Sequence, residues 1–348
     1  MLVSGVNLVA TEKDVVESRA SGVGWHSLLR PLEPFLSAVS HQLRLQVAAF
    51  EPEIASFAEY ALTNQGKQLR PALVGCAGDA GAGFSDDLVK AAVIIEMVHL
   101  ATLVHDDIMD GADIRRNRPT LCAHSGNEVS VLLGDCLFAR ALELASEFPT
   151  TEVCALVSRA TRNVCSGEIL QTLRYKKSLH NREDYLKTLE LKTAELFALS
   201  CELGGMIGGL NRRSQLQLKQ FGVSMGIAYQ IYDDCLDIFG NEDQVGKSLG
   251  TDLATGKMTL PALIMLEKLP EPEKNEIISK LFQWNGGQKI WLMDLLKQAQ
   301  SLEGCVDVMQ GYVDKSNTAL IDLEQDGHGI ALKKVISYLS QQISLLTY

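Results

Sequence analysis

Residues 91–110 read Ala-Ala-Val-Ile-Ile-Glu-Met-Val-His-Leu-Ala-Thr-Leu-Val-His-Asp-Asp-Ile-Met-Asp, an apolar segment that ends in three aspartates. A helix drawn through this segment is apolar on almost every side, which is typical of a helix buried inside a large bundle. Its longest apolar run, 91–104, is shorter than the roughly 20 residues that cross a bilayer, and Glu96 and His99 interrupt it. The segment therefore predicts a central helix of a soluble fold, and we expect no transmembrane segment.

The remainder of the chain has the same helical character. Apolar residues recur at helical spacing, alternating strand patterns are scarce, and the nine prolines mostly separate the helical stretches. We predict an all-α fold, a single large helical bundle around a central cavity. Residues 111–127 and 240–256 are polar, contain glycine and are predicted to be irregular. The predicted helices are 34–49, 53–64, 70–80, 86–109, 128–147, 152–174, 182–209, 214–239, 258–268, 272–283, 288–300, 303–323 and 328–346.

The domain organisation follows from what the chain lacks. A length of 348 residues favours about two domains, but no linker, repeat or low-complexity block divides it. A secretory signal would have a basic start and an apolar core near the N-terminus. This part of the chain instead carries the acidic residues Glu12, Asp14 and Glu17, so we expect no such signal. We therefore predict a flexible tail over 1–25 and one domain over 26–348.

Charge and cysteine content narrow the function and the compartment. The 32 basic and 43 acidic side chains give a net charge of −11, so we expect no binding to nucleic acid, which requires clustered Lys and Arg. An anionic substrate would need local cations or metal ions. The eight cysteines are scattered without a C-x-x-C pair, which argues against zinc and for reduced thiols, and so for a cytoplasmic protein.

Two segments share the pattern D-D-x-x-D, and each follows an apolar helical stretch. The first ends the segment quoted above, and the second lies within Ile-Tyr-Asp-Asp-Cys-Leu-Asp at 231–237. Carboxylates spaced i, i+4 lie on one helix face and repel each other, and the negative end of the helix dipole adds to the repulsion. Mg²⁺ prefers such oxygen ligands. One cluster alone could be a solvated acidic helix end, whereas two predict a metal site formed by Asp106, Asp107, Asp110, Asp233, Asp234 and Asp237.

Basic side chains near these clusters indicate a phosphate-bearing ligand. They lie in polar segments, and each alone could be a surface charge. Carboxylates that hold Mg²⁺ beside a ring of cations suit a diphosphate, because the metal bridges its oxygens and the cations neutralise the remaining charge. The candidates are Lys67, Arg70, Arg115, Arg116, Arg118, Lys192, Lys247 and Lys257.

Other motifs fit less well. Gly240 to Ser248 is similar to a P-loop, but five residues instead of four separate Gly240 from Gly246. A calcium loop starting at Asp106 would place Ile108 and Asn117 at ligand positions. His105-Asp106 leaves open a His-Asp metal phosphohydrolase, although that interpretation gives the second cluster no role.

These motifs together strongly resemble the trans-isoprenyl diphosphate synthases, the polyprenyl synthetase family. A terpene cyclase would carry one D-D-x-x-D and a different second metal motif. The chain departs from the family in having Gln65 and Gln68 around Gly66-Lys67, and Asn117-Arg118 after the arginine pair. The resemblance is carried by G-K-x-x-R-P at 66–71, Glu96 with His99, the two D-D-x-x-D clusters, Arg115-Arg116, Gly134-Asp135, Gly167-Glu168-x-x-Gln171, Lys192-Thr193-Ala194, Gln230, and Gly246-Lys247 through Asp252 to Lys257 and Pro261.

The resemblance implies an isoprenoid synthase fold and a Mg²⁺-dependent prenyltransferase that condenses isopentenyl diphosphate with an allylic diphosphate. It implies three Mg²⁺ ions, a homodimer, and transient membrane contact for product release. Asp106 and Asp110 would bind Mg²⁺ on the allylic diphosphate, and Asp233 and Asp237 would hold a further ion. Lys67, Arg70, His99 and Arg116 would hold isopentenyl diphosphate. Arg115, Lys192, Lys247 and Lys257 would contact the allylic diphosphate. Thr193 and Gln230 would lie near the developing allylic cation, and Lys192, Thr193, Gln230, Asp106 and Asp233 would be the catalytic residues.

The residues before the first cluster bear on product length. In short-chain members of the family, a Phe or Tyr near the position of Ala101 blocks the elongating tail, and alanine leaves the path open. Thr102 and Val98 share that helix face. The chain thus looks most like the long-chain octaprenyl, solanesyl and decaprenyl diphosphate synthases. Two alternatives remain: a shorter-chain synthase of the geranylgeranyl or farnesyl type, or a helical subunit that assists a partner synthase.

Overall fold

The computed structural model describes residues 24–63, 66–79, 81, 83–116, 118–176, 181–240, 257–281, 287, 289–325 and 328–348. Most of the predicted tail, together with Lys247 and Asp252, lies outside the described residues. Trp25, which the prediction placed at the end of the tail, already begins a helix, and its ring lies 5.6 Å from that of Tyr338.

The fold is all-α, as the sequence predicted. In the described part of the chain, the strands are confined to an antiparallel pair in which Ile114 faces Pro119 and Arg115 faces Arg118. The elements are α2 (Trp25–Leu29), η1 (Arg30–Leu32), α3 (Glu33–Ala48), α4 (Pro52–Leu62), α5 (Leu69–Ala77), α6 (Asp86–Met109), β1 (Ile114–Arg115), β2 (Arg118–Pro119), α7 (Leu121–Ser125), α8 (Asn127–Ser146), α9 (Glu152–Lys176), α10 (Arg182–Leu189), η2 (Glu190–Ala194), α11 (Glu195–Ile207), α12 (Arg212–Phe239), α15 (Leu260–Glu267), α16 (Glu271–Leu281), α17 (Lys289–Gln298), α18 (Ser301–Gln325) and α19 (Ile330–Ser344).

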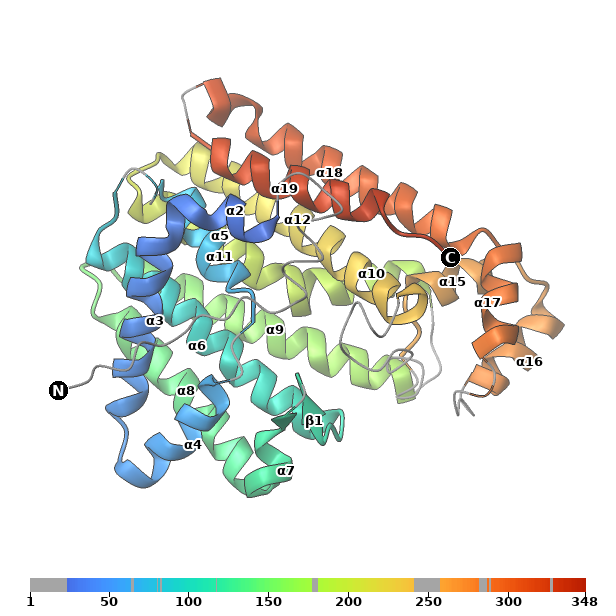
Figure 1. Cartoon of the computed structure of the whole chain (residues 1–348), viewed down its shortest axis with the longest axis horizontal. Helices are drawn as coiled ribbons and strands as arrows, with labels where there is room; N and C mark the ends of the chain where they lie inside the picture. Colours follow the sequence, from blue (N-terminus) through green and yellow to red (C-terminus); the bar gives the residue numbers. More distant parts are fainter. Residues whose placement is uncertain are drawn as a thin grey trace.

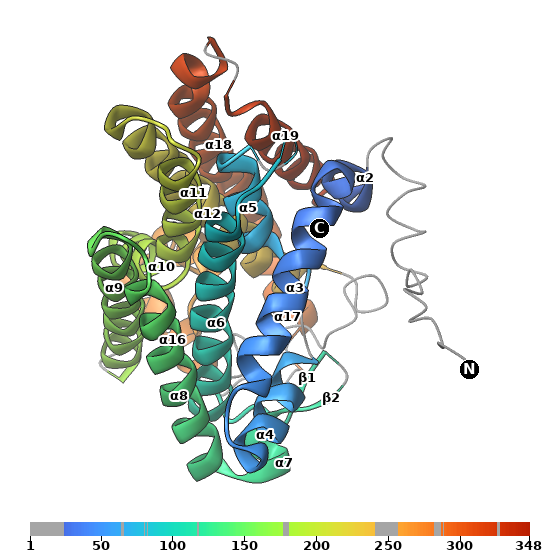
Figure 2. The same cartoon turned by 90° about the vertical axis from the view of Figure 1, so that its left-hand side faces the viewer.

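Helix α6 is the central helix that the opening segment predicted. Its N-terminus is capped by Ser85, whose hydroxyl accepts from Leu88 N, and Asp86 and Asp87 complement the helix dipole in the first turn. Neighbouring helices surround α6, including α3, α8 and α11 (Figures 1 and 2). Its length and composition would allow it to cross a membrane, but 67% of its most apolar window is buried inside the structure. It is therefore built as a core helix.

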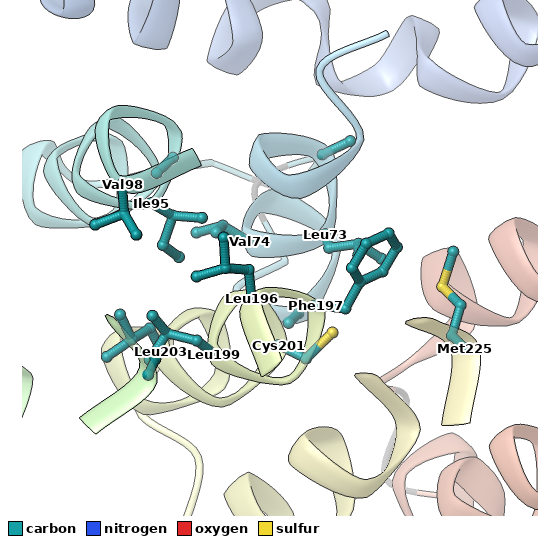
Figure 3. Close-up of a cluster of buried hydrophobic side chains, with 14 of the residues drawn as sticks. Leu73, Val74, Ile95, Val98, Leu196, Phe197, Leu199, Cys201, Leu203 and Met225 are labelled. Atoms are coloured by element: carbon teal, nitrogen blue, oxygen red, sulfur yellow. The ribbon is translucent and has the colours of Figure 1, made fainter. Parts of the chain in front are cut away.

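Figure 3 shows how α6 is packed. Val98 and Ile95 of α6 point toward Leu199 and Leu203 of α11, and Val74 of α5 lies beside them. All five side chains are at most 3% exposed. Burial of side chains this size contributes about 1.5–3 kcal/mol each, so this three-helix contact stabilises the centre of the bundle. A second, smaller core joins α15, α16 and α17, which lie at one end of the molecule (Figure 1).

Glycines allow helices to approach closely, as the sequence suggested for 204–209. A Cβ at Gly204 would collide with the backbone of Val74 on α5. Gly222 and Gly226 of α12 likewise face the backbone of Ala198 and Ala194. The spacing of four residues continues along α12 to Gln230, so this close contact brings that side chain against η2.

Two local predictions were incomplete. The predicted helix 182–209 is α10, one π-helical turn η2 and α11. The predicted irregular stretch 111–127 contains the β1–β2 hairpin and the short helix α7, whose N-cap Thr120 accepts from Ala123 N. Both differences lie next to predicted site residues.

Candidate active site

The first aspartate cluster lies where α6 ends. Asp106 and Asp107 are in the last helical turn, and Asp110 is the C-cap residue. Asp107 is 6% exposed and accepts a 2.6 Å bond from Arg115 Nε on β1. Asp110 accepts two bonds, at 2.8 and 2.9 Å, from Lys257 Nζ. The resemblance assigned the metal on the allylic diphosphate to Asp106 and Asp110, and the structure holds Asp107, between them in sequence, against the hairpin.

The second cluster lies near the C-terminal end of α12. Asp234 and Asp237 are buried, at 5% and 1% exposure. Both oxygens of Asp234 are engaged: Tyr185 OH donates to Oδ2 at 2.6 Å, and Gln230 Nε2 donates to Oδ1 at 2.8 Å. This geometry assigns Asp234 a structural partner on α10, which the sequence pattern did not indicate.

The π-helical turn η2 connects the two clusters. Lys192 Nζ lies 4.0 Å from Asp106 Oδ2, and Thr193 Oγ1 donates to Gln230 Oε1 at 3.1 Å. Helix α9 approaches η2 so closely at Gly167 that a Cβ there would collide with Lys192 N. Single π turns are frequent at functional sites. Here Lys192 and Thr193, adjacent in sequence, contact Asp106 and Gln230 respectively, and Gln230 is bonded to the second cluster at Asp234.

Helix α9 supplies further partners of Lys192. Its ammonium forms an ion pair with Glu168 and donates to Gln171 Oε1 at 3.0 Å. The nearby carboxylates, Asp106 foremost, raise the pKa of Lys192 although burial opposes them. Lys192 therefore stays charged. Burial raises the pKa of Asp106 to about 6, with Glu168 and Asp110 adding to the rise and Lys192 opposing it.

A second group of cations surrounds His99, which lies about two helical turns before Asp106 on α6. Arg70 of α5 donates from a terminal nitrogen to His99 Nε2 at 3.1 Å, and its guanidinium lies 4.9 Å from the centre of the Phe197 ring. Burial, reinforced by Arg70 and Arg116, holds the pKa of His99 well below its usual value. His99 is thus neutral and accepts at Nε2. Arg70 Nε is buried without a hydrogen-bond partner among the described residues, which leaves a donor for a ligand.

Arg116 completes this group. It adopts a left-handed backbone conformation at the turn of the hairpin, with φ of 51°. Its guanidinium lies against Gly66, where any Cβ would collide with it. The carbonyl of Lys67, the next residue, accepts a 3.4 Å bond from the Trp25 indole. Arg70, His99 and Arg116 therefore lie close to one another, although they come from segments far apart in sequence, and Lys67 directly follows the glycine that contacts Arg116.

The donors suit Mg²⁺ by their chemistry. They are carboxylate oxygens in crowded, partly buried positions, and the raised pKa of Asp106 reflects the cost of burying its charge beside like charges. Within the described ranges, no three Asp, Glu, His or Cys side chains lie close enough to hold an ion as they stand. The oxygens of Asp107 and Asp110 are instead paired with Arg115 and Lys257.

His105 lies apart from this site. Its Nε2 is 3.0 Å from Val131 O of α8 and 3.7 Å from Asp135, and the ring packs where a Cβ at Gly134 would collide with it. Its imidazole thus faces α8. This orientation disfavours the phosphohydrolase alternative, which needs His105 and Asp106 on one metal.

The predicted chain-length residues lie inside the core. Ala101 and Val98 are 0% and 1% exposed, and Thr102 donates to the carbonyl of His99 at 2.7 Å. Sequence reasoning missed Tyr185 and gave no role to Glu96, Glu168 and Gln171. The last three belong to motifs, which was the available signal. Nothing in the pattern singled out Tyr185.

Comparisons with known proteins agree with this site. The polyprenyl synthetase family matches residues 51–294, and the chain belongs to that family. Heptaprenyl diphosphate synthase component 2 of Geobacillus stearothermophilus is 32% identical over 88% of this chain and 95% of its own length. The chain is therefore a trans-prenyl diphosphate synthase, a prenyltransferase of a family that depends on Mg²⁺ in general.

Solved structures show the same fold. A decaprenyl diphosphate synthase from Rhodobacter capsulatus has a TM-score of 0.82 and 29% identity, covering 92% of this chain and 99% of that one. A polyprenyl synthase from Caulobacter crescentus CB15, complexed with calcium and isoprenyl diphosphate, also has a TM-score of 0.82 and 29% identity, with 94% and 99% covered. Further relatives range from a short-chain isoprenyl diphosphate synthase to a solanesyl-diphosphate synthase. The long-chain relatives support the long-chain prediction.

Proposed function

We propose that the chain extends an allylic diphosphate to octaprenyl-to-decaprenyl length by repeated addition of isopentenyl diphosphate at the site between α6, η2 and α12. The observation that carries this proposal is the linkage of both aspartate clusters through η2, with Lys192 and Lys257 on the first cluster. Mg²⁺, when bound, would neutralise the oxygens of the departing diphosphate. We propose that the site binds three Mg²⁺ ions, held by Asp106, Asp110, Asp233 and Asp237. Asp107 and Asp234 would support these ligands without holding an ion themselves.

The protein's own side chains would bind the two substrates and neutralise the charge that develops on the departing diphosphate. Arg115, Lys192 and Lys257 would neutralise the allylic diphosphate as its C–O bond ionises. Lys247 would join them, and it lies outside the described residues. Lys67, Arg70, His99 and Arg116 would hold the diphosphate of isopentenyl diphosphate, whose double bond then attacks the allylic carbon. The proton lost from the new chain would leave to the released diphosphate. The apolar core around Val98 would exclude water from the cation.

The experiment is a condensation assay with the purified chain. Labelled isopentenyl diphosphate and an allylic diphosphate are incubated with Mg²⁺, and the dephosphorylated products are sized by chromatography. A long polyprenol supports the proposal. Farnesyl- or geranylgeranyl-length products would assign a shorter-chain synthase, and free phosphate without condensation would favour a phosphohydrolase. No turnover by the chain alone, with turnover restored by a second subunit, would make it one component of a heteromeric enzyme.

We further propose that the working form is a cytoplasmic homodimer. All eight cysteines are free, which suits a reducing compartment. Val131 and Leu132 on α8 are 42% and 63% exposed, an apolar pair that a second copy could cover. Light scattering of Leu132→Glu would then report a monomer.

A product of this length is apolar, so we also expect transient membrane contact at release. The predicted tail, now ending before Trp25, and a single domain over the rest of the chain remain part of this proposal.

A further inference from the structure

Tyr185 begins a hydrogen-bonded series that crosses from α10 to η2. Its hydroxyl donates to Asp234 Oδ2 at 2.6 Å, and Asp234 Oδ1 accepts from Gln230 Nε2 at 2.8 Å. Gln230 Oε1 in turn accepts from Thr193 Oγ1 at 3.1 Å. Four side chains from three elements are thereby fixed relative to one another.

The series has a defined direction, because its groups differ in what they can donate. An ionised carboxylate only accepts, so the amide nitrogen of Gln230 must face Asp234 and the amide oxygen must face Thr193. Without Asp234, either orientation of the amide would satisfy the Thr193 hydroxyl, which both donates and accepts. Asp234 therefore decides which atom Gln230 presents beside Thr193.

Tyr185 in turn decides where Asp234 points. The carboxylate is 5% exposed, and the loss of a hydrogen bond at that depth costs about 1–3 kcal/mol or more. Tyr185 donates to Oδ2 from α10, and Gln230 donates to Oδ1 from the same helix as Asp234, so the two bonds together orient the carboxylate. A phenylalanine would fill the same space without the bond.

We propose that Tyr185 is a positioning residue for prenyl transfer: through Asp234 it holds the Gln230 amide oxygen beside the Thr193 hydroxyl, where both oxygens face the allylic carbon. This inference rests on the proposed function. Partial negative charge aimed at a developing cation lowers the barrier without tightening substrate binding. Tyr185 and Asp234 thus act on kcat rather than on metal or substrate affinity.

The first test compares Tyr185→Phe with wild type in the condensation assay. We expect kcat to fall about tenfold or more, the scale of lost supporting hydrogen bonds around a site, while KM for both substrates and the Mg²⁺ concentration for half-maximal rate stay within about twofold. Tyr348→Phe is the matched control, because that hydroxyl also donates to a carboxylate, that of Glu303 at 2.5 Å, outside the series. It should keep wild-type kcat.

The second test reverses the direction of the central bond. Asp234→Asn and Gln230→Glu should each lower kcat, because each removes the match between donor and acceptor. The double variant puts the donor at 234 and a carboxylate at 230, and so again presents an oxygen to Thr193 at unchanged net charge. We expect it to recover at least part of the lost kcat while KM stays unchanged, and this non-additive result would show that the two side chains act on kcat as a pair.

The outcomes separate this inference from the proposed function. Wild-type protein that fails to condense the substrates would overturn the proposed function. If wild type is active but Tyr185→Phe keeps kcat within twofold, the positioning role is wrong. The role is equally wrong if saturating Mg²⁺ restores the Tyr185→Phe rate, since Asp234 would then act through the metal.

Discussion

Lys257 donates from Nζ to both carboxylate oxygens of Asp110, at 2.8 and 2.9 Å, although the two residues are 147 positions apart. Both side chains are partly buried, at 23% and 29% exposure, so solvent screens the pair only in part. The ammonium occupies the oxygens that a metal ion would use. We therefore expect Mg²⁺ to compete with the Lys257 ammonium for the oxygens of Asp110.

The variant Lys257→Gln tests this competition. We expect Mg²⁺ to bind the substrate-free protein more tightly by calorimetry, because Asp110 no longer has a cation to exchange. We also expect kcat/KM for the allylic diphosphate to fall roughly 10- to 100-fold, the scale of a lost charge-assisted hydrogen bond. Lys268→Gln is the control, since its Nζ bonds to Ala299 O outside the site. Weaker Mg²⁺ binding in Lys257→Gln would contradict the competition.

Loss of a metal-binding carboxylate should be more severe. We expect Asp106→Ala or Asp233→Ala to lower kcat/KM by at least about 100-fold, the scale seen when one group that stabilises the transition state is removed. The far-ultraviolet circular dichroism should be unchanged, because neither carboxylate is part of the hydrophobic core. Asp322→Ala, which removes a surface ion pair with Arg213, is the matched control. Near-normal turnover in either site variant would rule out its metal role.

The helical bundle could be predicted from the sequence because its central helix has a strong apolar pattern. The apolar pattern of 91–104, which only Glu96, His99 and Thr102 interrupt, favours burial on almost every side, and this made α6 predictable to the residue. The hairpin at Ile114–Pro119 was missed because strands of two residues are too short to show alternation. The π turn at Glu190–Ala194 was missed because one extra residue within a long helical segment barely changes its periodicity.

The sequence predicted which residues form the candidate site better than it predicted which contacts each of them makes. Six aspartates look alike in two repeated motifs. The contacts that separate Asp107 and Asp234 from the others come from Arg115 and Tyr185, on the hairpin and on α10. Local spacing carries no information about such partners, because they meet only when the helices pack. Tyr185 in particular belongs to no motif that sequence reasoning could have weighed.

Metal affinity should depend on pH through Asp106. Burial raises the pKa of this carboxyl to about 6 in the metal-free protein, above its usual 3.8. Because the folded state holds the proton more tightly, this group's contribution to stability falls as pH rises from about 4 to 6. Mg²⁺ needs the ionised form, so calorimetry should show tighter binding at pH 7.5 than at pH 5. An Asp106→Asn variant should show less of this difference. Equal affinity of wild type at both pH values would argue against the assignment.

His99 should act as a neutral acceptor for Arg70. Its pKa is held well below the usual value by burial and by the nearby arginines, so the imidazole is neutral at neutral pH. We expect His99→Gln, which can still accept a hydrogen bond, to keep KM for isopentenyl diphosphate within about threefold. His99→Ala leaves Arg70 without that partner and should raise KM roughly tenfold, as the loss of a bond to a charged group predicts. A large KM increase in the glutamine variant would show that the imidazole contributes more than its acceptor.

Product length should respond to the volume at Ala101. This side chain is fully buried on α6, one turn after Val98 and one turn before the metal-binding carboxylates. Larger side chains there would project into the path of the growing tail, so Ala101→Val, Ala101→Leu and Ala101→Tyr should give progressively shorter products. Overpacking alone costs about 1–3 kcal/mol of stability. Ala262→Tyr, at a fully buried alanine in the second core, controls for that cost and should leave product length unchanged. Chromatography of the dephosphorylated products measures both. An unchanged length distribution in Ala101→Tyr would mean that the tail does not run along this face of α6.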